Sequence, residues 1–423
     1  MTTLHTLIIG AGLSGLACGI ALAKTGRRVT IVSAGPSTLQ LNGGAMELLG
    51  CVDGQEVICP IKAIARLPLD HPYQKIGAEH IATLALEAQQ LLGDAGVTLT
   101  GNARQNHWRI TPLGVLKPAW LSLRGMATSP MPDRLPWQHA TLLNLKGFVD
   151  FPIHFVAHNL SLLGCEVTVR DIEVESLGLP RRSASEMRAV NLARTIGVGS
   201  KLRHLAEAIN RVCDGDEAVL LPAIVGMEDD YPVNLLRRWV TAPLHHLATM
   251  PPSVPGTRMA ALLRHYFKML GGKFLTAESV GHVKLADHHI AAVYTAKSPG
   301  IPITAQHYVL ASGSLLSQGL VATRDAIVEP LMGLDVDAPA CREQWSHYGL
   351  MGDQPFMRCG VLTDAALRPL KDGTAIDNLH AIGSILSGHN PLTMGDGQGV
   401  DLLTALSVAH QLTTKCSLPP GRE

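Results

Sequence analysis

The sequence is poor in aromatic and charged side chains. Aromatic residues make up 4% of the 423 residues, and no block of basic residues occurs. Lys plus Arg and Asp plus Glu number 35 each, so the formal charge is zero. Nucleic-acid binding needs basic patches and base-stacking platforms, so the composition argues against it. The charged fraction of 17%, against about 25% in typical proteins, favours large buried surfaces that include an interface with another chain.

Cysteine pairs of the kind that hold metals are absent as well. The eight cysteines are scattered, and none stands in a C-x-x-C arrangement. This argues against a zinc ribbon or an iron–sulfur cluster in this chain. We therefore expect reduced thiols and no metal site.

Long apolar runs are also missing. Residues 7–23 carry no charge, but four glycines interrupt them, and a membrane span needs roughly 20 apolar residues. The start of the chain lacks the basic, apolar and cleavage regions of a signal peptide. We expect a cytoplasmic protein.

What the start of the chain does contain is one complete β-α-β unit. Residues 7–9 form a short apolar run, a small-residue helix follows over about 14–24, and 29–32 is a second apolar run. Gly10, Gly12 and Gly15 lie between the first strand and the helix in the spacing G-x-G-x-x-G, with Ser14 beside them. The first glycine makes a tight turn, the second lets a phosphate approach the backbone, and the third lets the helix pack close to the strand. The stretch predicts a nucleotide site at the helix N-terminus.

Further glycine turns mark later positions where backbone could meet a ligand. They are Gly43 and Gly44, then Gly313 after an apolar strand, and finally Gly383 with Ser384 at the end of a strand over 378–382. The last turn, Gly395-Asp396-Gly397-Gln398-Gly399, opens a predicted helix over about 401–413. For the pair at 43–44, an ordinary turn is an equally good interpretation.

The chain between these ends changes character. Three tryptophans and five prolines fall within residues 108–138, and an α/β rhythm of its own follows. At this length two or three domains are expected. We predict a Rossmann-like α/β flavin-binding domain from 1–105 and 256–423, with an inserted α/β cap over 106–255.

With both ends placed, the chain resembles flavoproteins of the glutathione-reductase-like class. It is more closely similar to the B subunits of bacterial anaerobic glycerol-3-phosphate dehydrogenases. The segments that carry the resemblance are spread from residue 6 to about 412. They include Arg-Ile-Thr-Pro-Leu-Gly at 109–114, Glu-Met-Arg-Ala-Val-Asn-Leu-Ala-Arg at 186–194, Met-Pro-Pro-Ser-Val at 250–254, Val-Leu-Ala-Ser-Gly-Ser at 309–314, Glu-Pro-Leu-Met-Gly-Leu-Asp-Val at 329–336 and Ala-Ile-Gly-Ser at 381–384.

The resemblance implies a role in oxidising sn-glycerol 3-phosphate to dihydroxyacetone phosphate, with electrons passed to the quinone pool during anaerobic growth. It implies a complex of three different chains. One is an FAD-dependent catalytic chain, the second is the present type with FMN, and the third carries iron–sulfur clusters at the membrane. This chain would then be peripheral on the inner face of the inner membrane, held there through the complex.

Two missing acids bear on the cofactor. A dinucleotide site has an acid about 20 residues past the glycines, on the adenosine ribose, and Ser33 stands there. The acid that usually follows the C-terminal strand glycine is replaced by Ser384. FMN has no adenosine ribose, so we favour FMN, with FAD at a weakened site as the alternative. Asp396 is expected near the reduced flavin, with capping of the helix as the more ordinary role.

Candidate catalytic groups come from the chemistry of alcohol oxidation. The hydroxyl proton needs a base, and the substrate phosphate needs cations. His389 precedes the last glycine turn, and Arg188 and Arg258 lie in or beside family-like segments. For each, a salt bridge or a solvated side chain is the alternative.

Three functions remain open. The chain transfers electrons through a bound flavin, or it oxidises the substrate itself, or it is a non-catalytic assembly component with a degenerate flavin fold.

Overall fold

The β-α-β stretch at the start of the chain forms as expected. The computed structural model describes residues 4–174, 187–213, 215–349, 352 and 354–414. Within it, β1 (Leu4–Ile9), α1 (Leu13–Lys24) and β2 (Val29–Ser33) are successive elements. Every residue of β2 is buried, and so are most residues of α1. The uncharged run at 7–23 is therefore the centre of a core.

Three further strands complete a five-stranded sheet with β1 and β2. They are β15 (Lys273–Thr276), β19 (Ala305–Leu310) and β26 (Leu379–Ala381), and the order is β15-β2-β1-β19-β26. All four pairings are parallel. Numbered by their succession in this sheet, the strands run 3-2-1-4-5, which is the dinucleotide-binding order. The predicted Rossmann-like α/β fold is confirmed.

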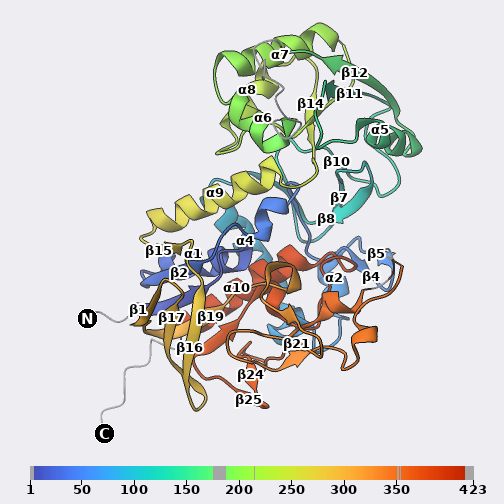
Figure 1. Ribbon diagram of the computed structural model, residues 1–423. Helices are drawn as coiled ribbons and strands as arrows, with labels where there is room; N and C mark the ends of the chain where they lie inside the picture. Colours follow the sequence, from blue (N-terminus) through green and yellow to red (C-terminus); the bar gives the residue numbers. More distant parts are fainter. Residues whose placement is uncertain (1–3, 175–186, 214, 350–351, 353, 415–423) are drawn as a thin grey trace. The chain divides into compact units, whose positions relative to one another are not determined.

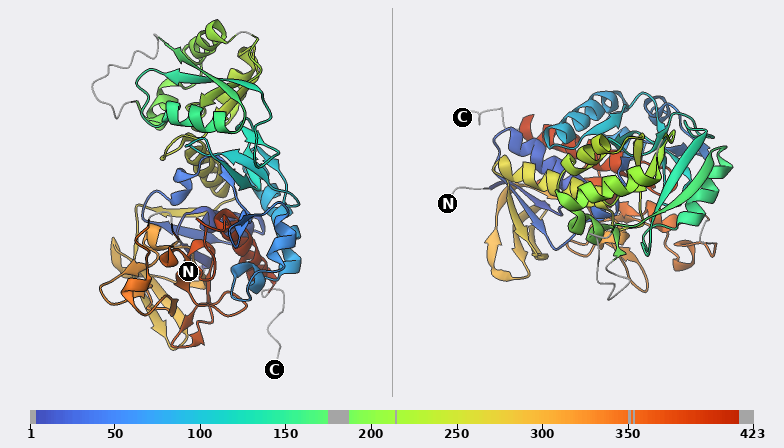
Figure 2. Two further views of the ribbon diagram at one scale, coloured as in Figure 1. Left: turned by 90° about the vertical axis from the view of Figure 1, so that its right-hand side faces the viewer. Right: turned by 90° about the horizontal axis from the view of Figure 1, so that it is seen from above.

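The two ends of the chain meet on this sheet. Helix α10 (Gly397–Thr414) packs against α1 and against α4 (Ile81–Asp94). Figure 1 shows α1 and α10, in blue and red, side by side, and Figure 2 shows the same blue and red segments together from two other directions. The helix predicted over 401–413 is thus present, and it begins four residues earlier than expected.

A meander fills the connection from β15 to β19. It consists of β16 (Val280–Ala286), β17 (His289–Thr295) and β18 (Ser298–Ile303), paired antiparallel. The residues between β15 and β16 therefore lie at the carboxyl edge of the main sheet.

The middle of the chain forms a second parallel sheet of four strands. Its order is β12-β11-β13-β14, from β11 (His139–Leu145), β12 (Glu166–Ile172), β13 (Val219–Pro222) and β14 (Leu244–Leu247). Buried apolar side chains lie on both of its faces, as a parallel sheet requires. The accompanying helices are α5 (Ile153–Leu162), α6 (Ala189–Ile196), α7 (Ser200–Val212) and α8 (Tyr231–Trp239).

The chain divides into two compact units. One comprises residues 1–38, 47–95 and 263–423, and the other comprises 39–46 and 96–262. The first β-α-β and the last helix fall in the same unit. We keep the division into 1–105, 106–255 and 256–423 as a proposal for the functional domains. In the compact units the first junction lies at 95/96, about ten residues before the predicted 105/106, and the second lies at 262/263, seven residues after the predicted 255/256.

Shorter elements complete the two units. In the first they are α2 (Pro60–Ile64), α3 (Pro72–Lys75), β4 (Cys51–Val52), β5 (Gln55–Glu56), β20 (Val321–Ala322), β21 (Ile327–Val328), β22 (Val336–Asp337), β23 (Gly360–Val361), β24 (Leu370–Lys371) and β25 (Thr374–Ala375). In the second they are β3 (Ala45–Met46), β6 (Leu99–Gly101), β7 (His107–Ile110), β8 (Leu116–Ala119), β9 (Leu121–Leu123) and β10 (Thr128–Ser129). Helix α9 (Val254–Met269) belongs to both.

One of the eight cysteines expected as reduced thiols, Cys416, lies outside this description. The seven cysteines within the described residues are free thiols. Over the same residues, no helix is long and apolar enough to cross a membrane.

Candidate cofactor-binding site

A cavity of about 270 Å³ opens at the carboxyl ends of β1 and β19. Strand order reverses between these two strands, and ligands of open α/β sheets bind at such a point. Every lining residue belongs to the first unit. The walls are Ile9–Ser14, Val32–Thr38, Glu278–Val280, Ala311–Gly313, Ser317, Gln318, Pro330, Leu331, Ser384 and Asp401.

Each glycine of the first turn has a separate steric reason. A Cβ on Gly10, whose φ is +115°, would lie 2.1 Å from the Ala311 carbonyl oxygen. A Cβ on Gly15 would lie 2.1 Å from the Gly10 carbonyl oxygen, so this glycine lets helix and strand pack closely. A Cβ on Gly12 would meet nothing within 4 Å, and Gly12 lines the cavity. The space that a side chain would take there is the space that the second glycine leaves for a phosphate.

The N-terminus of α1 supplies the electrostatic attraction. No side chain caps it, and its first turn contains no acid. Its free N–H groups and partial positive charge attract an anion. None of the described residues that line the cavity is Lys, Arg or His. A bound phosphate would therefore be held by backbone N–H groups and hydroxyls.

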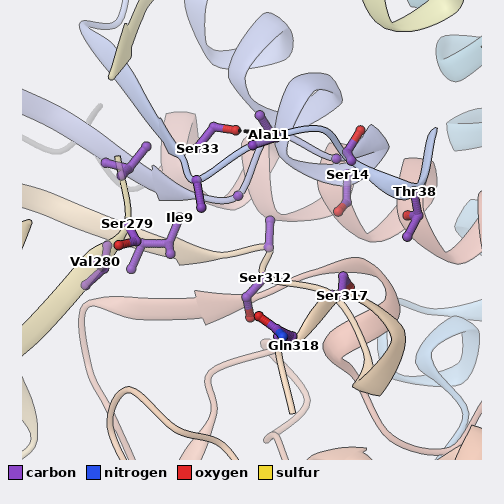
Figure 3. A pocket seen from close by; sticks show the side chains of 18 of the residues that line it. Ile9, Ala11, Ser14, Ser33, Thr38, Ser279, Val280, Ser312, Ser317 and Gln318 are labelled. Atoms are coloured by element: carbon purple, nitrogen blue, oxygen red, sulfur yellow. Dashed lines mark hydrogen bonds between the residues drawn. The ribbon is translucent and has the colours of Figure 1, made fainter. Parts of the chain in front are cut away.

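The cavity extends past the end of β2. The N–H of Glu278 donates to the Ser33 carbonyl, at 3.0 Å, which continues the pairing of β15 with β2. Glu278, Ser279 and Val280 therefore lie beside Ser33 at the cavity wall. In Figure 3, Ser33, Ser279 and Val280 gather at one end, whereas Ser14 and Ser312 lie further along.

The other end of the cavity is closed by the turn after β26. The Ser384 N–H and hydroxyl both donate to Oδ1 of Asp401, at 3.1 and 3.4 Å. A Cβ on Gly383 would lie 2.4 Å from the same oxygen and 2.5 Å from the Ser14 hydroxyl. Burial raises the pKa of Asp401 to about 6, against the opposing effects of His389 and the Ser384 bonds.

One polar group in the cavity wall has no partner. The Ser312 hydroxyl oxygen is buried and makes no hydrogen bond within the described structure. Buried hydroxyls nearly always bond to something, so this one suits a ligand atom. Together with the open space at Gly12 and the uncapped helix, it fits the phosphate of a flavin nucleotide.

The structure gathers six of the predicted cofactor residues at this cavity, namely Gly10, Gly12, Ser14, Ser33, Gly313 and Ser384. Gly15 and Gly383 support the wall from behind. Gly43 and Gly44 belong to the second unit and pack near Ala248 and Pro255. No local sequence pattern pointed to Glu278 or Asp401, which line the cavity from other parts of the chain.

The last glycine turn is occupied by protein groups. The N–H of Gly399 donates to the Glu47 carbonyl, at 2.9 Å, and the Gln398 side chain accepts the Glu47 N–H, at 3.2 Å. A Cβ on Gly397 would lie 2.8 Å from Cβ of Pro391, and Gly395 lies against Gly50. None of these glycines lines the cavity, so a direct contact with cofactor stays a prediction.

Asp396 joins two histidines in the core of the first unit. Its Oδ2 lies 3.2 Å from Nε2 of His71 and its Oδ1 lies 3.2 Å from Nδ1 of His389. The Asp396 and His71 side chains are fully buried, and that of His389 is 2% exposed. Nδ1 of His71 accepts the Tyr73 N–H, so its proton is on Nε2. Burial would raise the pKa of Asp396, but the two imidazoles hold it well below its usual range.

This arrangement leaves one nitrogen of His389 for other chemistry. Nδ1 faces an ionised carboxylate and donates to it, which makes Nε2 the accepting nitrogen. No described residue bonds to Nε2. The side chain of Asp396 thus bonds to the histidines and to the Asn390 N–H, at 3.4 Å, rather than to the first turn of α10.

The two predicted arginines lie in the second unit, where protein groups already bond to them. Arg258 is 5% exposed and donates to the Val225 and Gly226 carbonyls, at 3.4 and 2.7 Å. Arg188 pairs with the buried Asp150 and donates to the Pro251 carbonyl. Neither lines the cavity, so phosphate binding by either is still only a prediction.

Comparisons with known proteins agree with this geometry. The family described as FAD binding domain matches residues 5–400. A protein of Yersinia pestis bv. Antiqua (strain Antiqua), named as the B subunit of anaerobic glycerol-3-phosphate dehydrogenase, is 40% identical over 417 residues, which is 97% of this chain and 98% of the relative. A protein of the same name from Pectobacterium carotovorum subsp. carotovorum (strain PC1) is 38% identical over 97% of this chain and 99% of its own length.

Among solved structures, the 3-ketosteroid delta1-dehydrogenase from Sterolibacterium denitrificans is a distant neighbour. It is 11% identical, with 98% of this chain and 100% of that chain covered and a TM-score of 0.44. The assignment to a family therefore follows from the sequence matches.

Proposed function

This chain belongs to the family of anaerobic glycerol-3-phosphate dehydrogenase B subunits and is a flavin-containing oxidoreductase component; from this we infer that it takes part in oxidising sn-glycerol 3-phosphate to dihydroxyacetone phosphate. Electrons would pass to the quinone pool. The observation that carries the proposal is the cavity at the β1/β19 crossover, with an open space at Gly12 and an uncapped helix beside it.

For the cofactor we propose FAD, with FMN as the alternative. The missing acid at Ser33 favours FMN on sequence grounds. Two observations support FAD instead: the cavity continues beyond Ser33 to Glu278–Val280, and the matching family is an FAD binding domain. A cavity that ended at the phosphate would suit FMN. One that runs on along the edge of the sheet has room for an adenosine.

Different residues along the cavity would hold different parts of the flavin nucleotide. The N–H groups at the start of α1, with the Ser14 and Ser312 hydroxyls, would hold phosphate oxygens. Ser384 and Asp401 would hold the part nearer the ring. When bound, the flavin would supply a two-electron acceptor.

If this chain oxidises the substrate itself, His389 is our candidate for the base that takes the hydroxyl proton. Oxidation of an alcohol releases a proton as well as two electrons, and the base must be positioned and unprotonated to take it. Asp396 fixes the ring of His389 through Nδ1, and Nε2 is left as the acceptor. Asp396 is a positioning residue, since its contacts are with the imidazoles.

We propose further that two other chains complete the complex: an FAD-dependent catalytic chain and an iron–sulfur chain that anchors the complex at the inner face of the inner membrane. The named relatives are B subunits, which supports the presence of partners. In this arrangement a flavin held at the β1/β19 cavity would carry electrons between the catalytic chain and the iron–sulfur chain.

Anaerobic flavin reduction tests the proposal. The purified chain is mixed with glycerol 3-phosphate, and absorbance in the flavin bands is followed with and without the FAD-dependent catalytic chain. Bleaching only in the presence of that chain supports electron transfer between the two. Bleaching of the isolated chain would mean that it oxidises the substrate itself. A colourless protein with no flavin would leave a non-catalytic assembly role.

A further inference from the structure

Two carboxylates enter the cavity from opposite edges of the main sheet. Glu278 follows β15, the strand at one edge, and Asp401 lies in α10 beside the turn after β26, the strand at the other edge. They are the only charged side chains among the described residues of the cavity wall. Both are acids, in a cavity that otherwise fits a phosphate.

The negative charge of both side chains needs a physical explanation. Ionised carboxylates repel phosphate oxygens, and they accept hydrogen bonds but cannot donate them. A ligand that was nothing but an anion would be disfavoured by both. A ligand that carries hydroxyl groups on each side of its phosphates would instead donate to them, and such charge-assisted bonds are among the stronger ones.

Glu278 lies beside the position where an acid is missing. Its N–H bonds to the carbonyl of Ser33, the residue at the end of β2. Oε1 accepts the Lys297 N–H, at 2.9 Å, which fixes the carboxylate. No described residue bonds to Oε2. One oxygen is thus held by protein and the other is available.

Asp401 likewise lies beside the second position where an acid is missing, which is Ser384. Its Oδ1 accepts both donors of Ser384, the residue that follows Gly383. Oδ2 bonds to no described residue. Again one oxygen anchors the carboxylate to the backbone turn, and the other is available to a ligand.

We propose that Glu278 and Asp401 replace in space the two acids that the chain lacks at Ser33 and Ser384, and that each accepts hydrogen bonds from hydroxyls of the bound flavin nucleotide. Glu278 takes the ribose of the adenosine half, and Asp401 takes the ribityl chain. The inference rests on the proposed flavin site and on FAD as its ligand. It makes the adenosine half a specific ligand of this chain although residue 33 is not an acid.

Equilibrium titration of the flavin-free full-length chain with FAD and with FMN, followed by quenching of flavin fluorescence, tests the two roles separately. Glu278→Gln is expected to weaken FAD binding by about tenfold or more and to leave FMN binding unchanged. Asp401→Asn is expected to weaken FAD and FMN binding by a similar factor. Glu79→Gln, which changes an exposed glutamate paired with His80, is the matched control and should change neither.

A compensating substitution shows whether the carboxylate itself matters. Ser33→Asp in the Glu278→Gln protein restores an acid beside the lost one and should recover FAD affinity while FMN affinity stays constant. A merely structural role of Glu278 would give no such recovery.

The outcomes separate the two levels of the proposal. If wild-type protein binds FAD and Glu278→Gln binds it equally well, or if Asp401→Asn binds both flavins equally well, the corresponding role is wrong and the flavin site stands. Wild-type protein that binds FMN but not FAD overturns the role of Glu278. Wild-type protein that binds neither flavin overturns the proposed function and this inference with it.

Discussion

Nδ1 of His389 lies 3.2 Å from Oδ1 of Asp396, in a part of the core where neither side chain has more than 2% of its surface exposed. A buried carboxylate is stable only when hydrogen bonds and nearby positive groups offset its desolvation. His71 provides the second bond, also at 3.2 Å. The carboxylate thus fixes two imidazoles, of which only His389 has a nitrogen left to act as an acceptor.

Asp396→Asn should therefore destabilise the protein and change its response to acid. An amide cannot reproduce both bonds with full charge, so we expect a loss of about 2 to 4 kcal/mol at pH 7. Because the folded-state pKa of Asp396 is depressed, its contribution is present above the ordinary aspartate pKa of about 3.9 and is lost as pH falls below it. Urea unfolding at several pH values measures both.

His71→Gln is the matched variant for this experiment. It removes the other partner of Asp396 and leaves the bond to His389 in place. Both variants should lower stability, but only Asp396→Asn should alter the pH profile of flavin reduction in the complex. Equal pH profiles for both variants and wild type would show that Asp396 does not position a proton acceptor.

Two glycine substitutions should separate binding from folding. Gly12→Ala places a methyl group in open space at the cavity, so the protein should fold with unchanged stability and lose flavin affinity by about tenfold or more. Gly15→Ala places a methyl group 2.1 Å from the Gly10 carbonyl oxygen, so it should lower stability by about 1 to 3 kcal/mol. Thermal unfolding of the flavin-free proteins and flavin titration give the two numbers. A Gly12→Ala protein that retains full affinity would place the phosphate elsewhere.

Asp401 should make the flavin-free protein less stable as pH rises. Its folded-state pKa of about 6 lies above its ordinary value of 3.8, so the folded state binds more protons between these values. Stability therefore falls as pH rises from about 4 to about 6 and is constant above. Asp401→Asn should remove this loss and stabilise the protein at pH 7 by about 1 to 2 kcal/mol.

Asp94→Asn, which changes an exposed aspartate paired with Lys24, is the control for charge alone. Flavin affinity should instead rise over the same pH range, since the Asp401 carboxyl, which accepts the bond from the flavin, is ionised above about pH 6. If Asp401→Asn were both less stable and unchanged in flavin affinity, the carboxylate would have a structural role only.

Arg258→Met should distinguish a structural from a phosphate-binding arginine. The side chain is buried and holds the carbonyls of Val225 and Gly226, so its loss leaves them without this donor and should cost about 2 to 4 kcal/mol. Flavin content of the folded fraction should stay at the wild-type level. A stable variant with a raised KM for glycerol 3-phosphate would show that Arg258 binds the substrate rather than only stabilising the fold.

The parts of the site that are local in the sequence could be predicted from it. Gly10, Gly12 and Gly15 act within one turn, and the strand, helix and strand around them have distinct apolar patterns. The spacing from the glycines identifies residue 33 as the position where an acid is expected, and the sequence shows that this residue is Ser33. The inference from this absence to FMN assumed that no other acid could reach the same place.

Acids do lie beside both positions, through contacts that no local pattern indicates. Glu278 reaches Ser33 because β15, about 240 residues later, pairs with β2. Asp401 reaches Ser384 because α10 begins at Gly397, earlier than its pattern indicates, and turns its first residues toward the strand end. His71, likewise, meets Asp396 only through the fold. Pairings between distant segments had to be seen in the structure.

In our proposal the β1/β19 cavity holds one flavin nucleotide, and this nucleotide is FAD. Acid extraction of the purified chain, followed by chromatography of the released flavin, decides both points at once. We expect one FAD for each wild-type chain and little or none for Gly12→Ala. FMN as the released flavin would contradict the assignment of the adenosine half, and wild-type protein without any flavin would contradict the flavin site itself.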